Sequence, residues 1–191
     1  MYHFFAYIAR LRNITRWGLM RNTFPENDQE HAMQTAVIAH ALATIRNVRY
    51  GGTLNAERIA SMALYHDAGE VITGDLATPI KHFNPEVRQA FDALERMARG
   101  KLVAMLPQDL QAAYRPYLLP DEAADAWRVI KAADRICAYL KCVEELKAGN
   151  AEFEKAHGLI LRDIRSLALP EVDDFMREFA PSFALSLDEL N

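Results

Sequence analysis

The stretch ALYHDAGEVITGDLATPIKHF, residues 63–83, is the irregular centre of a chain that otherwise follows helical periodicity. It contains Gly69, Gly74 and Pro79, which together predict the end of a helix followed by a loop. On both sides of it the apolar residues recur at steps of three and four, and strand signals are scarce. The sequence therefore predicts an all-α fold, with one helical-bundle domain over residues 1–191.

The helix expected before this stretch runs from about Glu30 to Arg46, with Asp28 as its N-cap. One stripe of this helix is formed by His31, Thr35, Ile38, Leu42 and Ile45. Further helices are expected over residues 56–66 (capped by Asn55), 85–106 (with a break near Gly100), a short segment that starts at Pro107, 121–148 and 151–167. Pro116 and Pro120 are expected to bracket a loop, and the tail to form a short amphipathic helix and an extended end.

Composition excludes several classes of partner. A net charge of −4 gives the chain no electrostatic attraction to nucleic acid polymers or to anionic membranes. No run of about 18 apolar residues exists that could span a membrane, and no signal peptide is expected at the start. Cys137 and Cys142 suit reduced core thiols, so the cytoplasm is the expected compartment.

Four residues form a candidate metal site. His66 and Asp67 are adjacent at a predicted helix end, and His31 lies on the apolar stripe of the earlier helix. Asp134 lies on a largely apolar helix face, where a carboxylate is costly unless it is paired or bound to a cation. We therefore expect one divalent metal ion on His31, His66, Asp67 and Asp134. Each residue alone has another interpretation: His31 as a core histidine, and Asp134 as a partner of Arg128 or Lys131.

This ligand set predicts phosphohydrolase chemistry. Imidazole and carboxylate ligands suit Co²⁺, Mn²⁺, Mg²⁺, Zn²⁺ or Fe²⁺ without choosing among them. Four protein ligands leave an octahedral ion about two positions, one for a phosphate oxygen and one for a water whose pKa the metal lowers. Glu70 follows Asp67 by three residues, on the same side of a helix as the pair. His40 is nine positions from His31, so it faces the other side of its helix and is expected to be structural.

The order His, His-Asp and distant Asp on a helical chain is the pattern of the HD-domain phosphohydrolase superfamily. Nearly the whole chain also resembles the bacterial HD-domain 5'-deoxynucleotidase family, often called the YfbR family. The resemblance is carried by RLRNITRWGLMRN, QEHAMQTAVIAHALA, YHDAGEVITGDLATPIKHFN, KAADRICAYLKCVEELKAGNAEF and PSFALSLDEL. The Arg16-Trp17 pair and GDLATP, residues 74–79, are far more specific than His-Asp alone.

The resemblance implies a homodimeric enzyme that removes phosphate from deoxyribonucleoside 5'-monophosphates and disfavours ribonucleotides. It implies that Arg16 orients the phosphate and that Trp17 packs against the sugar, where its indole would exclude a 2'-hydroxyl. Asp75 would lie near the 3'-hydroxyl, and Glu70 would be the general acid/base that positions the attacking water. The substrate contacts implied are Arg16, Trp17, Asp67, Asp75, Leu76, Ala77, Thr78 and Asp134.

Two departures from the family pattern concern substrate preference. Ala77 stands where the family loop usually has proline, and Gln29 stands where it usually has serine. Three alternatives stay open at this point: a triphosphohydrolase or phosphodiesterase of the same superfamily, a metal-containing nucleotide sensor without catalysis, and Trp17 as an ordinary core aromatic. Polyphosphate substrates would favour a more basic pocket than Arg16, Arg21 and Lys81 provide.

Overall fold

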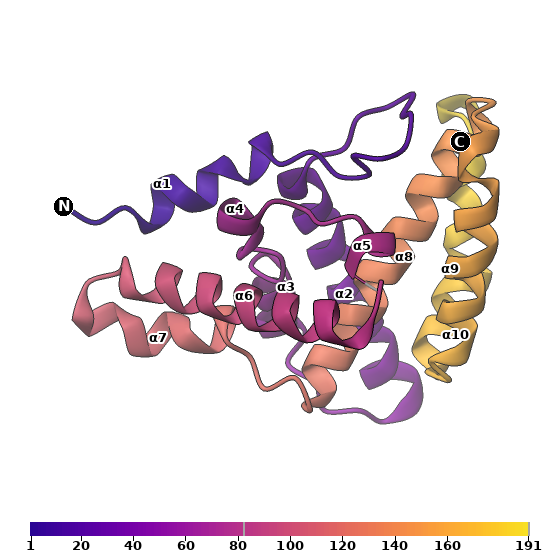
Figure 1. Cartoon of the computed structure of the whole chain (residues 1–191). Coiled ribbons are helices and arrows are strands. Elements are labelled where there is room, and N and C mark those ends of the chain that lie inside the picture. The colour runs from indigo at the N-terminus through magenta and orange to yellow at the C-terminus, as the bar shows by residue number, and fades with distance from the viewer. Residues whose placement is uncertain (82, 191) are drawn as a thin grey trace.

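The computed structural model describes residues 1–81 and 83–190, and within them the chain forms helices and turns but no β-strand (Figure 1). The all-α prediction is confirmed. His82, which follows Lys81, lies outside the described residues. The α-helices are α1 (Phe4–Ile8), α2 (Asp28–Tyr50), α3 (Ala56–Ala63), α4 (Glu70–Thr73), α5 (Thr78–Lys81), α6 (Pro85–Ala104), α7 (Gln108–Leu118), α8 (Asp125–Lys147), α9 (Glu154–Ser166) and α10 (Pro170–Glu178). The 3₁₀ helices are η1 (Ala9–Asn13), η2 (Ala151–Phe153), η3 (Ala180–Ala184) and η4 (Leu187–Leu190).

The long helices α2 and α8 form the centre of the molecule. They pack against each other, with α9 and α10 on one side and the α6–α7 hairpin on the other (Figure 1). Fully buried alanines on both helices, among them Ala39, Ala43 and Ala133, leave room for close approach of the two backbones. Close packing of α2 on α8 brings His31 and Asp134 to the same place.

The start of α2 differs from the prediction. Its N-cap is Asn27, not Asp28, and the side chain of Asn27 accepts hydrogen bonds from the backbone of Gln29 and Glu30. The Glu30 carboxylate bonds back to the Asn27 N–H and completes a capping box. Asp28 is therefore the first helical residue, and its side chain is buried. The predicted stripe from His31 to Ile45 is buried, as expected.

Other boundaries also differ. Helix α3 ends at Ala63, before the expected His66, and a series of turns follows. Pro116 lies inside the last turn of α7 rather than in a loop, and Pro107 is the N-cap of α7 rather than its first residue. Helix α6 continues through Gly100, and α8 begins at Asp125. The extended end expected for the tail consists of two 3₁₀ helices instead, η3 and η4.

Among the described residues, no helix is long and apolar enough to cross a membrane.

Candidate active site and metal centre

Three separate segments bring the predicted metal ligands together. His31 comes from α2, Asp134 from α8, and His66 and Asp67 from the turns after α3. One ligand atom from each residue can be chosen so that all four lie within 4.8 Å of one another. His31 Nε2 is 3.1 Å from Asp134 Oδ1, and His66 Nε2 is 3.0 Å from Asp67 Oδ2. Residues separated by about a hundred positions in the sequence thus form one compact donor set.

His66 is oriented as a metal-ligating histidine would be. Its Nδ1 donates to the carbonyl of Ala63 over 2.7 Å, which fixes the ring and directs Nε2 toward the other three candidate ligands. Nε2 is buried and has no hydrogen-bond partner. After α3 the chain continues in tight turns, in which the backbone N–H of His66 also donates to the carbonyl of Ala63, and this carbonyl lies within reach of the His66 ring. The residues present therefore fit a divalent metal ion of the kind that the sequence predicts.

The charges of the cluster also favour a cation. Burial opposes the charged form of His66, but the carboxylates of Asp67 and Asp134 outweigh it and raise the pKa of His66 to about 9. Burial alone would raise the pKa of both carboxyl groups. The charge of His66 lowers the pKa of Asp67, and Lys131, His31 and His66 lower that of Asp134. Both aspartates are therefore ionised and able to bind metal.

Lys131 contacts the cluster at Asp134. Its ammonium donates to Asp134 Oδ2, while Asp134 Oδ1 faces His31. Of the two alternative partners considered for Asp134, Lys131 is thus present and Arg128 is not, since Arg128 pairs with Asp125. Asp134 therefore contacts Lys131 and is also one of the four candidate metal ligands.

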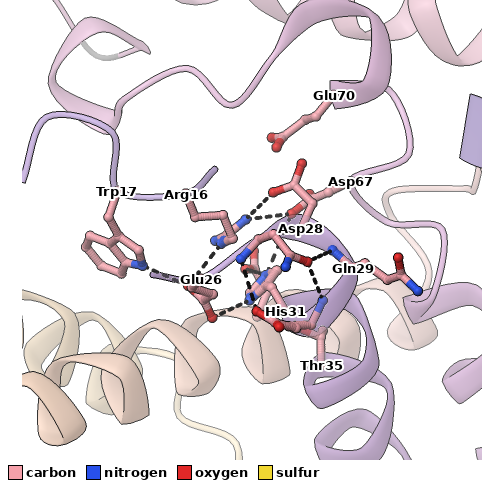
Figure 2. Close-up of polar contacts among 12 residues, drawn as sticks. Arg16, Trp17, Glu26, Asp28, Gln29, His31, Thr35, Asp67 and Glu70 are labelled. Atoms are coloured by element: carbon pink, nitrogen blue, oxygen red, sulfur yellow. Dashed lines mark hydrogen bonds and ion pairs between the residues drawn. The ribbon is translucent and has the colours of Figure 1, made fainter. Parts of the chain in front are cut away.

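Arg16 extends over the cluster from the loop between η1 and α2 (Figure 2). A backbone bridge between Thr15 and Asn27 closes this loop, which we call the 15–27 loop. Arg16 Nη1 lies 3.2 Å from Asp67 Oδ2. Burial opposes the charge of Arg16, but surrounding carboxylates, Asp67 foremost, outweigh it and raise its pKa. The guanidinium is therefore charged and held beside a candidate metal ligand.

Trp17 adopts a strained backbone conformation. Its φ of 58° lies in the left-handed region, which is unusual for a bulky residue and is found where the surroundings impose it. Its Nε1 donates to Glu26 Oε2 over 2.9 Å, and its ring lies 5.3 Å from that of Phe153 between centroids. The indole is half-buried, so it is neither a core residue nor a free surface side chain.

Glu70 begins α4 and faces the same cluster (Figure 2). Its side chain is buried, and one carboxyl oxygen, Oε2, has no hydrogen-bond partner. Burial and the charges of Asp67, Asp28 and Asp75 raise the pKa of Glu70 to about 11, against the lowering effect of Lys81. At this pKa the carboxyl group is protonated at neutral pH and can donate a proton beside the centre. Lys81 Nζ lies 3.7 Å from Glu70 Oε1.

The predicted substrate loop follows α4 directly. Asp75, Leu76 and Ala77 are half-buried, and Thr78 is exposed at the start of α5. Asp75 is near enough for its charge to raise the pKa of both Glu70 and Asp28. The loop therefore borders the centre on the side of Glu70.

Sequence reasoning missed two acidic residues of the site. Glu26 lies 3.8 Å from His31 Nδ1 and 3.4 Å from Arg16 Nε, as well as bonding Trp17. Asp28 is 3.5 Å from Arg16 Nη1, and burial raises its pKa to about 7. The position of Asp28 before a helix indicated a cap, and nothing in the local sequence distinguishes Glu26.

Comparisons with known proteins agree with this architecture. The family model described as 5'-deoxynucleotidase YfbR-like matches residues 3–183. A 5'-deoxynucleotidase of Vibrio parahaemolyticus is 50% identical over 99% of this chain and 98% of its own length. One from Klebsiella pneumoniae is 50% identical over 99% of this chain and 96% of its own.

Solved structures show the same fold. An HD-domain phosphohydrolase from Listeria innocua matches with a TM-score of 0.84 and 21% identity, over 97% of this chain and 90% of that one. The cyanophage HD phosphohydrolase DatZ, bound to dA and one catalytic Zn²⁺, matches with a TM-score of 0.67 and 22% identity. That match covers 93% of this chain and 95% of DatZ.

Proposed function

This chain belongs to the 5'-deoxynucleotidase YfbR-like family, and from that premise we propose which of its residues carry the reaction. It is a hydrolase of phosphoric monoesters that converts deoxyribonucleoside 5'-monophosphates into deoxynucleosides and phosphate. The observation that supports our assignment is the convergence of three groups on one point: the cluster of four ligands, the Arg16 guanidinium and the Glu70 carboxyl.

We assign the metal to His31, His66, Asp67 and Asp134. A divalent ion bound there supplies Lewis-acid activation of the phosphoryl group and of a water molecule. The unpartnered Nε2 of His66 and the ionised carboxylates of Asp67 and Asp134 support this assignment. Asp67 and Asp134 also border the phosphate in this arrangement, since Arg16 and Lys131 contact them.

Arg16 is assigned to phosphate binding, and Glu70 is assigned to proton transfer. The charged guanidinium group of Arg16 lies beside Asp67. Its N–H groups can donate two parallel hydrogen bonds to phosphate oxygens and stabilise the negative charge of the transition state. Glu70 orients the attacking water and accepts its proton as the new P–O bond forms, acting as the carboxylate that the positive charge of a bound divalent cation would favour. A proton is returned to O5' of the nucleoside as the old bond breaks.

The test is phosphate release from deoxy- and ribonucleoside mono-, di- and triphosphates, with Co²⁺, Mn²⁺, Mg²⁺, Zn²⁺ or Fe²⁺ in turn. We expect release from the deoxyribonucleoside monophosphates. A preference for triphosphates would favour the triphosphohydrolase alternative, and tight binding without release from any substrate would favour a sensor. Failure of every metal to support monophosphate hydrolysis contradicts the assignment.

Discrimination against ribonucleotides is assigned to Trp17. The contacts with Glu26 and Phe153 hold the indole in one place, and a fixed ring can reject an added hydroxyl by steric conflict. Asp75, Leu76, Ala77 and Thr78 then line the sugar and base on the other side, with Asp75 near the 3'-hydroxyl.

Trp17→Ala is expected to reduce the deoxy-to-ribo ratio of kcat/KM by roughly 10- to 100-fold, the range one small group in a pocket provides. The measurement compares kcat/KM for dAMP and AMP. Trp127→Ala removes the other indole, which packs against the helical core, and should leave the ratio unchanged. An equal ratio in Trp17→Ala and the parent protein would remove the steric explanation.

The outer face of α2 supports a homodimer. Met33, Val37 and Val48 share this face at helical spacing and are 66%, 62% and 79% exposed. Exposed apolar side chains in a row are typical of association surfaces. We expect light scattering to give twice the chain mass of 21.7 kDa, and Val37→Asp to give the single mass because it places a charge in the interface. Leu110→Asp, on α7, is the matched control and should stay dimeric; a monomeric parent protein would refute the proposal.

Cys137 and Cys142 are both buried and unpaired, which suits the reducing cytoplasm. We also propose that residues 1–191 form one HD domain, since the central helix pair packs against elements from both ends of the chain.

A further inference from the structure

The tip of the 15–27 loop is bound to the C-terminal end of α8 by one buried carboxylate. Glu145 is 0% exposed, and its oxygens accept hydrogen bonds from the backbone N–H groups of Thr23 and Phe24, over 2.9 and 3.1 Å. Asn150 Nδ2 donates to the same carboxylate over 2.8 Å and to the carbonyl of Arg21 over 2.7 Å. The loop that carries Arg16 and Trp17 is thus held at its far end as well as at the Thr15–Asn27 bridge.

Lys141 completes this arrangement from the preceding turn of α8. Its side chain is buried, and its ammonium donates both to Glu145 and to the carbonyl of Phe24. Burial opposes ionisation of Glu145, but the hydrogen bonds from Lys141, Asn150 and the loop backbone outweigh it and lower its pKa to about 2. A buried ion pair is costly to desolvate and is therefore weak evidence for a purely stabilising role. Apart from the bond between them, the hydrogen bonds of Lys141 and Glu145 go to the 15–27 loop and to Asn150, which itself binds that loop. The ion pair therefore serves mainly to hold the loop.

The 3₁₀ helix η2, which follows α8, supports the indole. Phe153, three residues beyond Asn150, lies 5.3 Å from the Trp17 ring and 5.8 Å from Lys141 Nζ. Trp17 is strained at a φ of 58°, and such a conformation persists only where surrounding contacts impose it. Those contacts are the hydrogen bond from the indole to Glu26 and the ring contact with Phe153, and Glu145 holds the loop tip a few residues further on.

We propose that Glu145, with Lys141, is a positioning residue that sets the place of Trp17 and Arg16 and so tunes the enzyme's preference for deoxyribonucleotides. Neither residue belongs to the metal cluster. The inference rests on the roles proposed above for Arg16 and Trp17. Loss of the carboxylate frees the loop tip, lets Trp17 relax from its strained conformation and opens the space that a 2'-hydroxyl needs.

The principal experiment compares Glu145→Gln with Glu171→Gln. Both replace a buried glutamate by a residue of the same size, and Glu171 lies on α10, 3.7 Å from Arg46. In Glu145→Gln the side-chain amide nitrogen takes the place of one carboxylate oxygen. It cannot accept the hydrogen bonds that the N–H groups of the loop, Lys141 and Asn150 donate there. We expect roughly a 10- to 100-fold loss of kcat/KM for dAMP, mostly as raised KM, because small displacements of positioning groups have effects of this size. The deoxy-to-ribo ratio should fall with it, and the metal content should stay at that of the parent protein.

A spectroscopic measurement reports on the loop without relying on turnover. Trp127→Phe leaves Trp17 as the single tryptophan, since the chain has two. In that background Glu145→Gln should shift the Trp17 emission to longer wavelength and increase its quenching by acrylamide. Glu171→Gln should do neither, even where it lowers the melting temperature.

The outcomes separate the positioning role from a structural one. If Glu145→Gln lowers thermal stability as Glu171→Gln does, but keeps KM, the deoxy-to-ribo ratio and Trp17 emission, the positioning proposal is wrong. If Trp17→Ala changes the deoxy-to-ribo ratio and Glu145→Gln does not, the positioning role of Glu145 is wrong while the proposed function stands. If Trp17→Ala leaves the ratio unchanged, the role of Trp17 and the inference built on it are both overturned.

Discussion

Glu70→Gln is expected to lower kcat by about 10²- to 10⁴-fold, the usual contribution of a general acid/base, with metal content unchanged. Glutamine keeps the size of the side chain but cannot exchange a proton with water or with the leaving oxygen. Glu70 is not among the four clustered ligands, so metal binding should survive the change. Steady-state kinetics with dAMP, together with metal analysis of the purified variant, measures both quantities.

Glu95→Gln provides the matched control. Glu95 is the other carboxylate that Lys81 contacts, over 3.2 Å, and it lies on α6, outside the centre. Its replacement removes a nearby negative charge and leaves the Glu70 carboxyl intact, so kcat should change little. Turnover of Glu70→Gln at the rate of Glu95→Gln would show that Glu70 is not the proton-transfer group.

The second large effect concerns the metal. Asp134→Ala is expected to reduce metal binding by at least about tenfold and to reduce turnover to the background level, because it removes a ligand that joins α8 to the other three. Chelation of the parent protein should have the same effect on turnover, and added metal should restore activity to the parent but not to the variant. His157→Ala changes a histidine that contacts Tyr139 and should keep both metal and activity.

Metal affinity should also depend on pH in a defined direction. In the absence of metal, the carboxylates around buried His66 hold its pKa at about 9, so at neutral pH its imidazole carries an extra proton. A metal ion needs the neutral ring and must displace that proton. Affinity should therefore rise with pH up to about 9, by about tenfold per unit from this one proton. Isothermal titration at several pH values measures the slope, and a flat profile between pH 6 and 8 would contradict it.

The helical periodicity predicted the centre of the fold well. The stripe that begins at His31 is buried along its length, and Asp134 lies on the facing helix as its apolar neighbours indicated. The order of His31, His66-Asp67 and Asp134, together with the apolar surroundings of His31 and Asp134, predicted the four residues that the structure brings together.

Local capping and long-range loop contacts could not be predicted in the same way. Asn27 and Asp28 are both good caps; Asn27 forms the capping box with Glu30, while the side chain of Asp28 is buried beside Arg16. Pro116 lies inside α7 although proline disfavours a helix interior, and only two helical residues follow it. In the sequence Glu145 is one of several charged residues on a helix, and nothing local marks it as buried. Its partners Thr23 and Phe24 lie more than a hundred residues away in the sequence.

The Thr15–Asn27 bridge joins the 15–27 loop, which carries Arg16, to the N-cap of α2, four residues before the candidate metal ligand His31. Changes here would alter metal affinity and phosphate affinity at once, so this part of the protein has little freedom to evolve. The segment from Asp75 to Thr78 borders the site without contributing a metal ligand. Adaptation to a new base or sugar should therefore accumulate in that segment, and libraries aimed at altered substrate range are best confined to it.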